Sequence, residues 1–385
     1  MIPYGRQDIT EEDISAVIGV LKSDFLTQGK ALPTFENDIN QYTGAKYSIA
    51  CNSGTSALHL TCRAINLSSE DWLWTSAITF ASSANCGLLC GAKVDFVDID
   101  SDDWNLSVEK LKERLVIAEK ENKLPKALVL VHFCGLPAKL REISNLCKKY
   151  NIYLIEDAAH ALGASYGGSK IGNCKISDFA ILSFHPVKSI TTGEGGMVLT
   201  NNHTFAERVR SLRSHGITRE PSSMTQKPHG PWFNEQIDLG YNYRMTDIQA
   251  ALGSSQLKRL DSYISIRNQK SERYRKELED LPITFQKIND GLYSSYHLFV
   301  IRLEIEKIRK SHQEIYSELL DSNIGVNLHY MPVYKHGYFK NMKFINTDFD
   351  QAEQYYKEAI TIPMYPTLKD SEQSYVIEKL REIIK

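Results

Sequence analysis

The fold is decided by a stretch near the N-terminus that reads KYSIACNSGTSALHLTCRAI and spans residues 46–65. Its first six residues form a short, β-prone apolar run, and residues 54–65 carry apolar side chains at helical spacing. Gly54 permits a tight turn between the two segments, so the stretch predicts a buried strand followed directly by a helix. A strand that leads straight into a covering helix is the building unit of a parallel α/β sheet.

The same alternation continues along the first two thirds of the chain. Further apolar strands are predicted at residues 72–76, 94–99, 127–131, 152–157, 179–184 and 196–200. Helices are predicted before or between them at residues 11–22, 82–90, 108–120 and 140–150. This order indicates a mainly parallel sheet with helices on both faces.

The alternation of short strands and helices ends after Asp247. A long, increasingly charged helical stretch is predicted at 248–281, and the later strands are predicted at 296–303, 325–330 and 360–365. Residues 220–232, rich in proline, are predicted to form an irregular loop. We therefore expect a large cofactor-binding α/β domain over residues 1–255, which includes an N-terminal substrate segment, and a smaller C-terminal α+β domain over residues 256–385.

The composition limits the classes of function. The 385 residues are 42% hydrophobic and 24% charged, which excludes a disordered or low-complexity chain. Forty-five basic and 47 acidic residues give a formal charge of −2, so the chain has no overall attraction for nucleic acid or for an anionic membrane. No apolar run approaches the roughly 20 residues that a membrane helix needs. We expect neither nucleic acid nor a membrane as a partner.

The seven cysteines lack the spacing of a disulfide framework, and their odd number favours free thiols in a cytoplasmic protein. Cys86 and Cys90 stand four residues apart on a predicted helix, but no second pair of metal ligands accompanies them. We therefore predict no metal site. The N-terminus is polar within a few residues and does not resemble a secretory signal.

The segment Ser53-Gly54-Thr55-Ser56 stands where the first strand meets its helix. Backbone N–H groups at a helix start attract an anion, and the hydroxyls add donors, so the segment is a candidate phosphate site. An ordinary helix cap would use the same residue types. The chain has neither the GxxxxGK[ST] nor the GxGxxG pattern, which argues against kinase, ATPase and nicotinamide-dependent functions.

Two charged residues follow other predicted strands. Asp157 ends the strand IYLIED, where ligands of α/β sheets bind, although a helix-capping Asp would look the same. Lys188 lies five residues after Ser183, between an apolar strand and the glycine-rich turn at 193–196. Lysines are usually solvated, but a lysine held in a pocket can have a lowered pKa and attack a carbonyl group.

An aromatic residue completes the set. Phe80 precedes the predicted helix at 82–90 and could cover a flat ring, although a plain core phenylalanine would give the same sequence. The four features have one economical explanation, which is pyridoxal phosphate. This cofactor needs a lysine for its aldehyde, a carboxylate for its ring nitrogen and a helix N-terminus with hydroxyls for its phosphate.

The chain resembles the DegT/StrS-type sugar aminotransferases, which have the aspartate-aminotransferase-like fold of pyridoxal-phosphate-dependent transferases, fold type I. The resemblance covers nearly the whole chain. It is carried by NSGTSAL (52–58), TFASSAN (79–85), EDAAHALGA (156–164), SFHPVKSITTGEGGMV (183–198) and LGYNYRMTDIQAALGSSQL (239–257). One departure is Leu136, where relatives often carry a polar residue.

The resemblance implies that eight residues bind the cofactor. Lys188 would bond covalently to the aldehyde, and Asp157 would pair with the protonated ring nitrogen. Phe80 would stack on the ring, and His160 would lie near the phenolic oxygen. The phosphate would be held by Thr55, Ser56 and Ser183, and by Asn242 from a neighbouring subunit.

The resemblance also implies a substrate. The segments IPYGRQDIT (2–10), LKSDFLTQG (21–29), RSHGITR (213–219) and GVNLHYMPVY (325–334) are most similar to the branch of the family that serves pseudaminic acid biosynthesis. Such an enzyme moves an amino group from L-glutamate to C4 of a UDP-linked 4-keto-6-deoxy-N-acetylhexosamine, in a homodimer with shared active sites. The sugar-nucleotide pocket would be lined by Tyr4, Asp24, Phe25, Leu26, Thr27, Ser183, Asn242, Arg244, His329 and Tyr330.

Three alternatives stay open at this point. The acceptor could be another nucleotide-linked keto sugar, such as a UDP-4-keto-pentose. The family also contains sugar dehydratases, but those relatives carry His where Lys188 stands. A regulatory relative that kept the fold without catalysis would not need Lys188 and Asp157.

Overall fold

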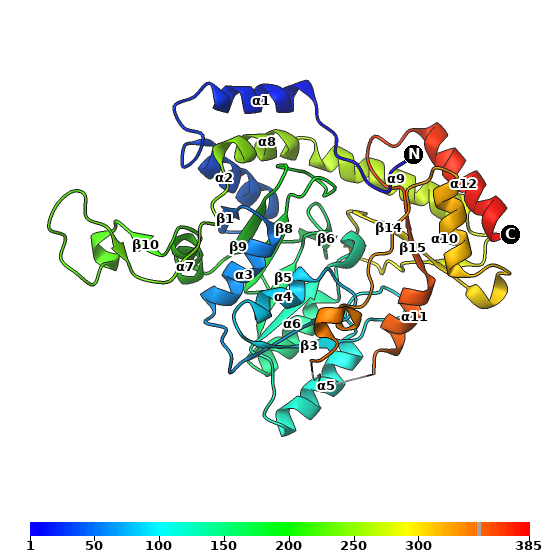
Figure 1. The fold of residues 1–385 in the computed structure, drawn as a ribbon, viewed down its shortest axis with the longest axis horizontal. Helices are drawn as coiled ribbons and strands as arrows, with labels where there is room; N and C mark the ends of the chain where they lie inside the picture. Colours follow the sequence, from blue (N-terminus) through cyan, green and yellow to red (C-terminus); the bar gives the residue numbers. More distant parts are fainter. Residues whose placement is uncertain (343, 345–347) are drawn as a thin grey trace.

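The computed structural model describes residues 1–342, 344 and 348–385, and its core is a seven-stranded sheet (Figure 1). The strands are β1 (Tyr47–Cys51), β2 (Trp72–Ser76), β3 (Lys93–Val97), β4 (Ala127–Val131), β5 (Tyr153–Asp157), β8 (Phe179–Ser183) and β9 (Gly196–Thr200). Their order across the sheet is β1-β9-β8-β5-β4-β2-β3. Strands β3, β2, β4, β5 and β8 pair in parallel, whereas β9 is antiparallel to both β8 and β1. The predicted mainly parallel sheet is confirmed.

Helices cover both faces of this sheet. One face packs with α3 (Gly54–Ala64), α4 (Ser82–Leu88) and α7 (His203–Arg213), and the other with α2 (Ala31–Thr43), α5 (Val108–Lys120), α6 (Leu140–Lys149) and α8 (Asp247–Leu257). Successive residues of β4 point to opposite faces: Val129 belongs to the first core and Leu128 and Leu130 to the second. A strand buried on both sides needs a continuous apolar run, and ALVLV supplies one.

The sequence analysis does not predict α2 and α7. Pro33 lies in the first turn of α2, where its missing N–H leaves no helical bond unmade, and Gly44 ends the helix with φ of 82°. In α7 the side chain of Asn202 caps the start by accepting from the N–H of Phe205 at 3.2 Å. Both helices bury one apolar face against the sheet, so packing stabilises them despite weak local signals.

The C-terminal part has its own small antiparallel sheet. Strand β14 (Phe299–Leu303) lies between β12 (Ile283–Phe285) and β15 (Ala359–Ile362). A third apolar core joins this sheet to α9 (Leu260–Glu277), α10 (His312–Asp321) and α12 (Asp370–Ile384), while α11 (Asp350–Glu358) packs into the first core of the large sheet. Among the described residues, no helix has both the length and the apolar character that crossing a membrane requires.

Two features of this part differ from expectation. The predicted strand at 325–330 is wrong, because Asn327 forms an isolated bridge with Thr361 and the rest of the segment is irregular. The helical stretch at 248–281 is divided into α8 and α9 around Lys258 and Arg259. The domain boundary predicted after residue 255 falls inside α8, and the boundary stays a prediction.

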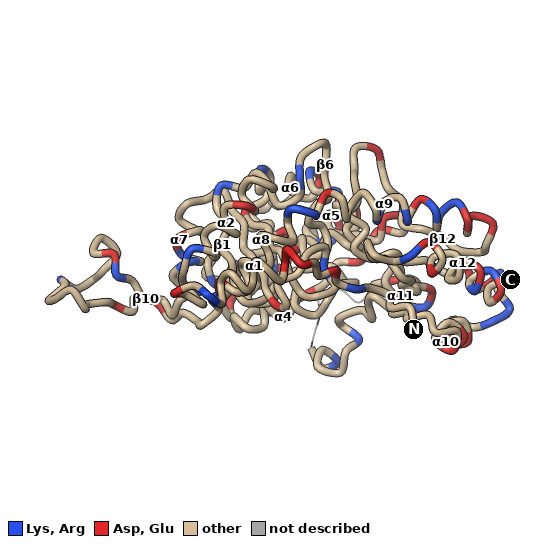
Figure 2. Tube along the Cα trace, turned by 90° about the horizontal axis from the view of Figure 1, so that it is seen from above, with Lys and Arg blue, Asp and Glu red and all other residues tan. Residues whose placement is uncertain are grey.

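A hairpin extends from the body of the molecule (Figure 1, Figure 2). It pairs β10 (Ile217–Thr218) with β11 (Glu235–Gln236), and between them lies the predicted irregular loop, with one short 3-10 turn at Pro221–Ser223. A further small sheet consists of β6 (Ser165–Tyr166), β7 (Ser169–Lys170) and β13 (Leu292–Tyr293). Basic and acidic residues are interspersed along the trace, as the balanced charge leads one to expect (Figure 2).

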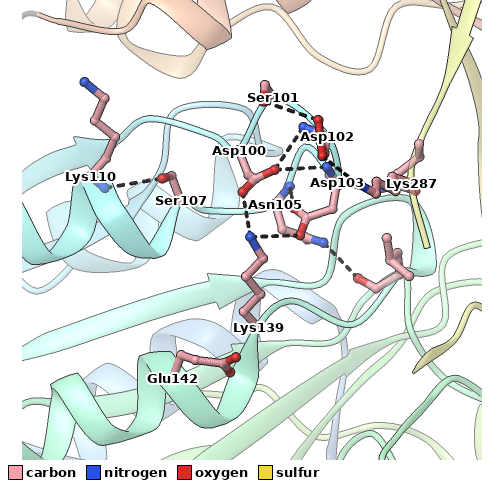
Figure 3. A network of polar contacts seen from close by, with 12 residues as sticks. Asp100, Ser101, Asp102, Asp103, Asn105, Ser107, Lys110, Lys139, Glu142 and Lys287 are labelled. Carbon is pink, nitrogen blue, oxygen red and sulfur yellow. Dashed lines mark hydrogen bonds and ion pairs between the residues drawn. The ribbon is translucent and has the colours of Figure 1, made fainter. Parts of the chain in front are cut away.

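The loop at residues 100–105 connects the large sheet to the C-terminal part (Figure 3). The Asp100 carboxylate accepts from Lys139 Nζ at 2.7 Å and from the backbone N–H of Asp102 at 2.9 Å. Asp102 accepts from Lys287 Nζ at 2.9 Å, and the carbonyl of Asp103 accepts from Gln286 Nε2 at 2.6 Å. These bonds fix residues that precede β14 against the loop that follows β3.

Candidate active site

Several strands end at one edge of the large sheet. Strands β5 and β8 are parallel neighbours, so Asp157 and Ser183 come out at the same edge. Gly196, at the start of the returning strand β9, is paired with both Ser183 and Cys51. The turn after β1 therefore lies beside Ser183, although some 130 residues separate the two in the sequence.

The turn after β1 forms a cradle at the start of α3. Ser53 caps the helix, since its Oγ accepts from the N–H of Ser56 at 3.1 Å. A Cβ at Gly54 would lie 3.0 Å from Cβ of Ser183, and a Cβ at Gly196 would lie 2.2 Å from the Ser53 carbonyl oxygen. The two glycines allow this close approach of backbones, which brings the start of α3 to the edge of the sheet. The backbone N–H groups of Gly54 and Thr55 there make no hydrogen bond to a described residue.

Three hydroxyls surround the cradle, and they differ in availability. Thr55 is exposed, with its Oγ1 2.8 Å from Ser82 Oγ. Ser56 is buried and donates to Oδ1 of Asn52 at 2.6 Å. The hydroxyl of half-buried Ser183 has no hydrogen bond to any described residue. Thr55 and Ser183 are thus the freest to meet an anion such as a phosphate, next to the positive end of the α3 dipole.

Asp157 stands at the end of β5 with a carboxylate that is 6% exposed. Ser83 Oγ donates to Oδ2 at 2.7 Å, and the N–H of Ala159 donates to Oδ1 at 3.2 Å. Burial raises the pKa of Asp157, while these hydrogen bonds and the charge of Lys188 act in the opposite direction. The carboxylate has lone pairs left for a cationic N–H group, such as a protonated ring nitrogen.

Lys188 lies half-buried in the turn that follows β8, where its N–H donates to the His185 carbonyl at 2.9 Å. Its Nζ is 3.5 Å from Nε2 of His297. Burial lowers the pKa of Lys188 to about 8, and the charge of Asp157 only partly offsets this effect. An amine with such a pKa is about one tenth uncharged at pH 7, far more than an ordinary lysine, and can act as a nucleophile.

Two imidazoles lie beside Lys188. His160 and His297 have ring centroids 4.4 Å apart, and the Tyr330 hydroxyl lies 3.2 Å from Nε2 of His160. Burial, followed by the charge of Lys188, holds the pKa of both histidines well below the ordinary value. Nδ1 of each ring is buried and makes no hydrogen bond to a described residue. Such orphaned polar atoms are expected where a polar ligand completes the site.

An exposed aromatic ring lies next to Tyr330. The Phe80 ring follows β2 and is 58% exposed, and its centroid is 6.0 Å from that of Tyr330. A phenylalanine this exposed is not the core residue that was the alternative interpretation. Together with the phosphate cradle, the amine of Lys188 and the carboxylate of Asp157, the open ring face gives a set of groups that fits pyridoxal phosphate.

Besides Ser183, the structure brings three of the predicted substrate residues to this site, Tyr4, His329 and Tyr330. Tyr4 packs its ring 5.2 Å from that of His329, which directly precedes Tyr330. A Cβ at Gly5 would lie 3.7 Å from Val187, so the N-terminal segment runs beside Lys188. His329 Nδ1 lies 2.8 Å from Thr361 Oγ1, and burial lowers the pKa of His329 to about 3.

Residues 24–27 lie elsewhere in this chain. All four are exposed, and their loop is held by Asp247, whose N–H donates to the Leu26 carbonyl at 3.0 Å and whose carboxylate accepts from the N–H of Gly29 at 2.8 Å. Within the described part of the chain no hydrogen bond or ring contact joins this loop to Lys188. Asp24 and Phe25 instead line a groove of about 1150 Å³ between α1 (Glu11–Leu21), α2 and α8.

Asn242 and Arg244 belong to a segment that lies near the cradle at the start of α3. The backbone of Asn242 pairs with Ser214, and the next residue, Tyr243, accepts from the N–H of Asn52 at 2.8 Å. The segment thus passes beside the cradle at α3. The Asn242 side chain is exposed, and the Arg244 side chain is half-buried with no hydrogen bond or ion pair to a described residue. Both side chains are free to reach a ligand.

Two residues of the site were missed by the sequence analysis. Ser83 belongs to the motif TFASSAN, and a serine one turn after Phe80 was the available signal. His297 lies just before β14, in a stretch read only as a strand. No local pattern distinguishes it from a satisfied core histidine, because its partner Lys188 is 109 residues away.

The sequence pattern of the DegT/DnrJ/EryC1/StrS aminotransferase family matches residues 7–381. The chain is 39% identical, over its full length and 98% of the relative, to the UDP-4-amino-4,6-dideoxy-N-acetyl-beta-L-altrosamine transaminase of Campylobacter jejuni. It is 34% identical, over its full length and 97% of the relative, to the spore coat polysaccharide biosynthesis protein SpsC of Bacillus subtilis.

Solved structures agree with these matches. Helicobacter pylori PseC, an aminotransferase involved in the biosynthesis of pseudaminic acid, superimposes with a TM-score of 0.90 at 29% identity, covering 100% of this chain and 99% of PseC. The PLP-form of the putative sugar aminotransferase Spr1654 from Streptococcus pneumoniae has a TM-score of 0.88 at 28% identity, covering 99% and 98%.

Proposed function

Because the chain belongs to the DegT/DnrJ/EryC1/StrS aminotransferase family, we propose that it transfers an amino group from L-glutamate to C4 of a UDP-linked 4-keto-6-deoxy-N-acetylhexosamine, in pseudaminic acid biosynthesis. The chain is a sugar aminotransferase and its cofactor is pyridoxal phosphate. The observation that carries the proposal is the half-buried Lys188 amine, which lies within the field of Asp157 in the turn that follows β8. The full-length similarity to the Campylobacter transaminase supports the choice of sugar.

The cofactor, when bound, supplies an aldehyde that takes up nitrogen and a ring that accepts an electron pair. We assign Lys188 to hold the aldehyde, Asp157 the ring nitrogen, Phe80 the ring face, and Thr55 and Ser183 the phosphate. In this assignment Ser56 contributes less than Thr55 and Ser183, because its hydroxyl already donates to Asn52 and its backbone N–H already donates to Ser53. His160 would lie near the phenolic oxygen of the cofactor.

The residues of this chain then have separate roles in the reaction. The Lys188 amine, with its pKa of about 8, would take the proton from the carbon that carries the transferred nitrogen and return it to the carbon that carries the nitrogen after the exchange. Asp157 would keep the neighbouring ring nitrogen protonated, since its carboxylate has capacity for one more strong hydrogen bond. The buried, neutral imidazoles of His160 and His297 add no competing cation next to Lys188.

Turnover on two acceptors tests the substrate. The purified enzyme is supplied with L-glutamate and either the UDP-linked 4-keto-6-deoxy-N-acetylhexosamine or a UDP-4-keto-pentose, and the products are identified by mass spectrometry and NMR. We expect a 4-amino sugar from the hexosamine and little product from the pentose. Preference for the pentose would overturn the proposed substrate, and a dehydrated product alone would overturn the aminotransferase reaction.

We further propose a homodimer with shared active sites, in the cytoplasm. The position of residues 24–27 supports the first part, because that loop lies away from Lys188 of its own chain and could serve a neighbouring one. Exposed apolar side chains on α1, on the hairpin and just after it supply apolar surface for a partner; they are Ile14, Ile18, Leu21, Trp232 and Leu239. All seven cysteines are free, which supports the cytoplasm.

Subunit mixing tests the shared site. The Lys188→Ala and Asn242→Ala variants are each expected to be impaired as homodimers. If Asn242 serves the partner's cofactor, a mixed dimer has one intact site, so re-equilibrated mixtures should regain about a quarter of the wild-type activity. No regain, with mixed dimers shown by mass, would contradict sharing through Asn242.

A further inference from the structure

The turn at residues 294–297, between β13 and β14, brings His297 to the candidate active site. Nε2 of His297 lies 3.5 Å from Nζ of Lys188. The preceding residue, Tyr296, has a φ of 44°, in the left-handed region that a bulky side chain rarely occupies. Backbone in such a conformation persists only where its surroundings hold it, and it is concentrated at functional sites. The contacts that hold this turn therefore bear on the position of His297.

Two neighbouring residues of α9 hold the turn. Nη1 of Arg267 donates to the carbonyl of Tyr296 at 3.1 Å and to the carbonyl of His297 at 3.3 Å. Nδ2 of Asn268 donates to the carbonyl of Ser294 at 3.0 Å. One helix thus supplies side-chain donors to three of the four carbonyls of the turn.

Further hydrogen bonds fix the same arrangement to other segments. Nη1 of Arg267 also donates to the carbonyl of Met364, just after β15, at 2.9 Å. The N–H of Ser295 donates to the Gly135 carbonyl at 3.0 Å, and the Ser295 hydroxyl donates to the His160 carbonyl at 2.6 Å. The turn is therefore held between α9 and the loops that carry other residues of the site.

The charge of Arg267 is unusual for its depth. Its side chain is 1% exposed, and burial lowers its pKa to about 10 with no carboxylate in the described chain to oppose the effect. Buried Arg302, in contrast, has its Nη2 2.7 Å from the Glu358 carboxylate. A buried charge without a counter-ion costs free energy that an apolar side chain of similar size would avoid. What Arg267 provides in return is a set of donors directed at the turn beside Lys188.

We propose that Arg267 is a positioning residue of the aminotransferase site, which holds the turn at 294–297 so that His297 stays beside Lys188. Arg267 acts through the backbone of the turn, since its described hydrogen bonds all go to carbonyl oxygens. Without these bonds the strained backbone at Tyr296 relaxes, and the imidazole moves away from Nζ. The catalytic effect of this positioning rests on the proposed function of Lys188, whereas the hold on the turn does not.

Hydrogen exchange in the full-length, cofactor-free protein tests the hold on the turn. Arg267→Met should raise amide exchange in the peptide that contains residues 294–298 by about tenfold or more, and leave the large sheet unchanged. Arg275→Met is the matched control, because Arg275 lies on the same helix and donates to a different carbonyl, that of Gln286, at 2.7 Å. It should leave the exchange of residues 294–298 unchanged. An unchanged peptide in Arg267→Met, or a rise spread over the whole chain, would overturn the proposal.

A double-mutant cycle tests whether Arg267 acts through His297. Arg267→Met should lower kcat by no more than the roughly 2- to 12-fold expected for His297→Phe, which removes one neutral hydrogen bond. In the His297→Phe background, the same change should lower kcat by less than about twofold further, because the imidazole is already absent. Losses that multiply in full would show that Arg267 acts independently of His297 and would overturn the positioning role.

Arg267→Lys supplies a conservative variant for the same cycle. It keeps the charge and part of the donor capacity, so it should fold even if Arg267→Met does not, and its kcat should lie between those of Arg267→Met and the wild type. Its remaining loss should also disappear in the His297→Phe background. A full additional loss there would contradict the proposal.

Failure of the proposed function would give a different result. Wild-type protein loaded with pyridoxal phosphate is reduced with borohydride and digested, and peptide mapping should find the cofactor on Lys188. Its absence from Lys188 would overturn the proposed role of that lysine. The exchange measurement on the cofactor-free protein would still decide whether Arg267 holds the turn.

Discussion

Two lysines of this chain stand near carboxylates, and they have opposite surroundings. Lys139 lies in the polar network of Figure 3, where its Nζ is 2.7 Å from Asp100 and 3.9 Å from Asp103. Burial alone would lower the pKa of Lys139, but these two carboxylates raise it. At Lys188 the balance is reversed: burial dominates, its described hydrogen-bond partner is a neutral imidazole, and the pKa falls to about 8.

The difference distinguishes a charge that holds the fold together from one that is kept for chemistry. Around Lys139 the surrounding carboxylates already have backbone N–H groups and lysines as partners within the fold. Around Lys188, the buried Nδ1 atoms of His160 and His297 lack partners among the described residues. A fold tolerates unsatisfied buried groups mainly where a ligand completes them.

The largest effect is expected from removing the side chain of Lys188. Lys188→Ala deletes both the group that bonds to the cofactor and the group that moves the proton. A positioned base alone contributes about 10²–10⁴-fold, so turnover should fall below detection. The measurement is kcat with L-glutamate and the keto sugar. The matched variant Lys139→Ala should keep kcat within about threefold; a comparable loss there would mean that the two lysines do not differ in role.

The second effect compares two buried aspartates, Asp157 and Asp103. Asp157→Asn keeps the shape of the side chain but removes the charge that would hold the ring nitrogen protonated. A hydrogen bond to a charged group contributes about 1.5–3 kcal/mol, so kcat should fall by roughly 10- to 150-fold. Asp103, whose pKa is raised to about 6 by burial and by the neighbouring Asp100, is the control. Asp103→Asn should leave kcat unchanged, and an equal loss in both variants would contradict the assignment.

The third prediction uses stability and its pH dependence. Burial lowers the pKa of Lys188 from 10.5 to about 8, so the unfolded chain binds the proton more tightly than the folded, cofactor-free protein. The contribution of the Lys188 amine to the free energy of unfolding is therefore fully present above about pH 10.5, and it is lost as the pH falls through 8. Lys188→Met should raise the free energy of unfolding at pH 7 by roughly 1–3 kcal/mol, with the gain vanishing near pH 10.5.

Lys139→Met should have the opposite sign. The pKa of Lys139 is raised, so its contribution is present below about pH 10.5 and is lost as the pH rises through the higher folded-state value. Because this lysine is partly exposed, its loss should lower the free energy of unfolding by no more than about 1 kcal/mol. Denaturation by urea at pH 7 and pH 10 measures both variants. A stabilising Lys139→Met or a destabilising Lys188→Met would contradict the comparison.

The parts of the molecule that local sequence could predict are those that local physics determines. The turn at Gly54 and the alternation of apolar strands and helices follow from backbone sterics and side-chain spacing. Helix α2 was missed because Pro33 looks like a break unless the start of the helix is known. The segment 325–330 has a strand-like pattern but finds little more than one pairing partner, Thr361, in the described structure.

The candidate site also contains residues that local sequence could predict and residues that it could not. Lys188, Asp157 and the cradle follow strands or turns, so their positions at the sheet edge could be inferred from topology. Ser83 and His297 act through contacts 74 and 109 residues away in sequence, which no local pattern encodes. The place of residues 24–27 could not be inferred at all, since it depends on the carboxylate of Asp247, more than 200 residues later.

The smallest expected effect tests His297, the missed neighbour of Lys188. His297→Phe fills the space but removes the hydrogen-bond partner 3.5 Å from Nζ. A neutral hydrogen bond contributes about 0.5–1.5 kcal/mol, so kcat should fall roughly 2- to 12-fold, and KM for the sugar should stay nearly constant. Because an imidazole that accepts from the amine favours its charged form, the acidic limb of the kcat profile should also move to lower pH. His297→Gln offers an acceptor again and should recover part of both changes. If Phe and Gln at this position behave alike, His297 contributes packing alone. The difference in pKa between Lys188 and Lys139 then depends on burial rather than on the choice of a neutral partner.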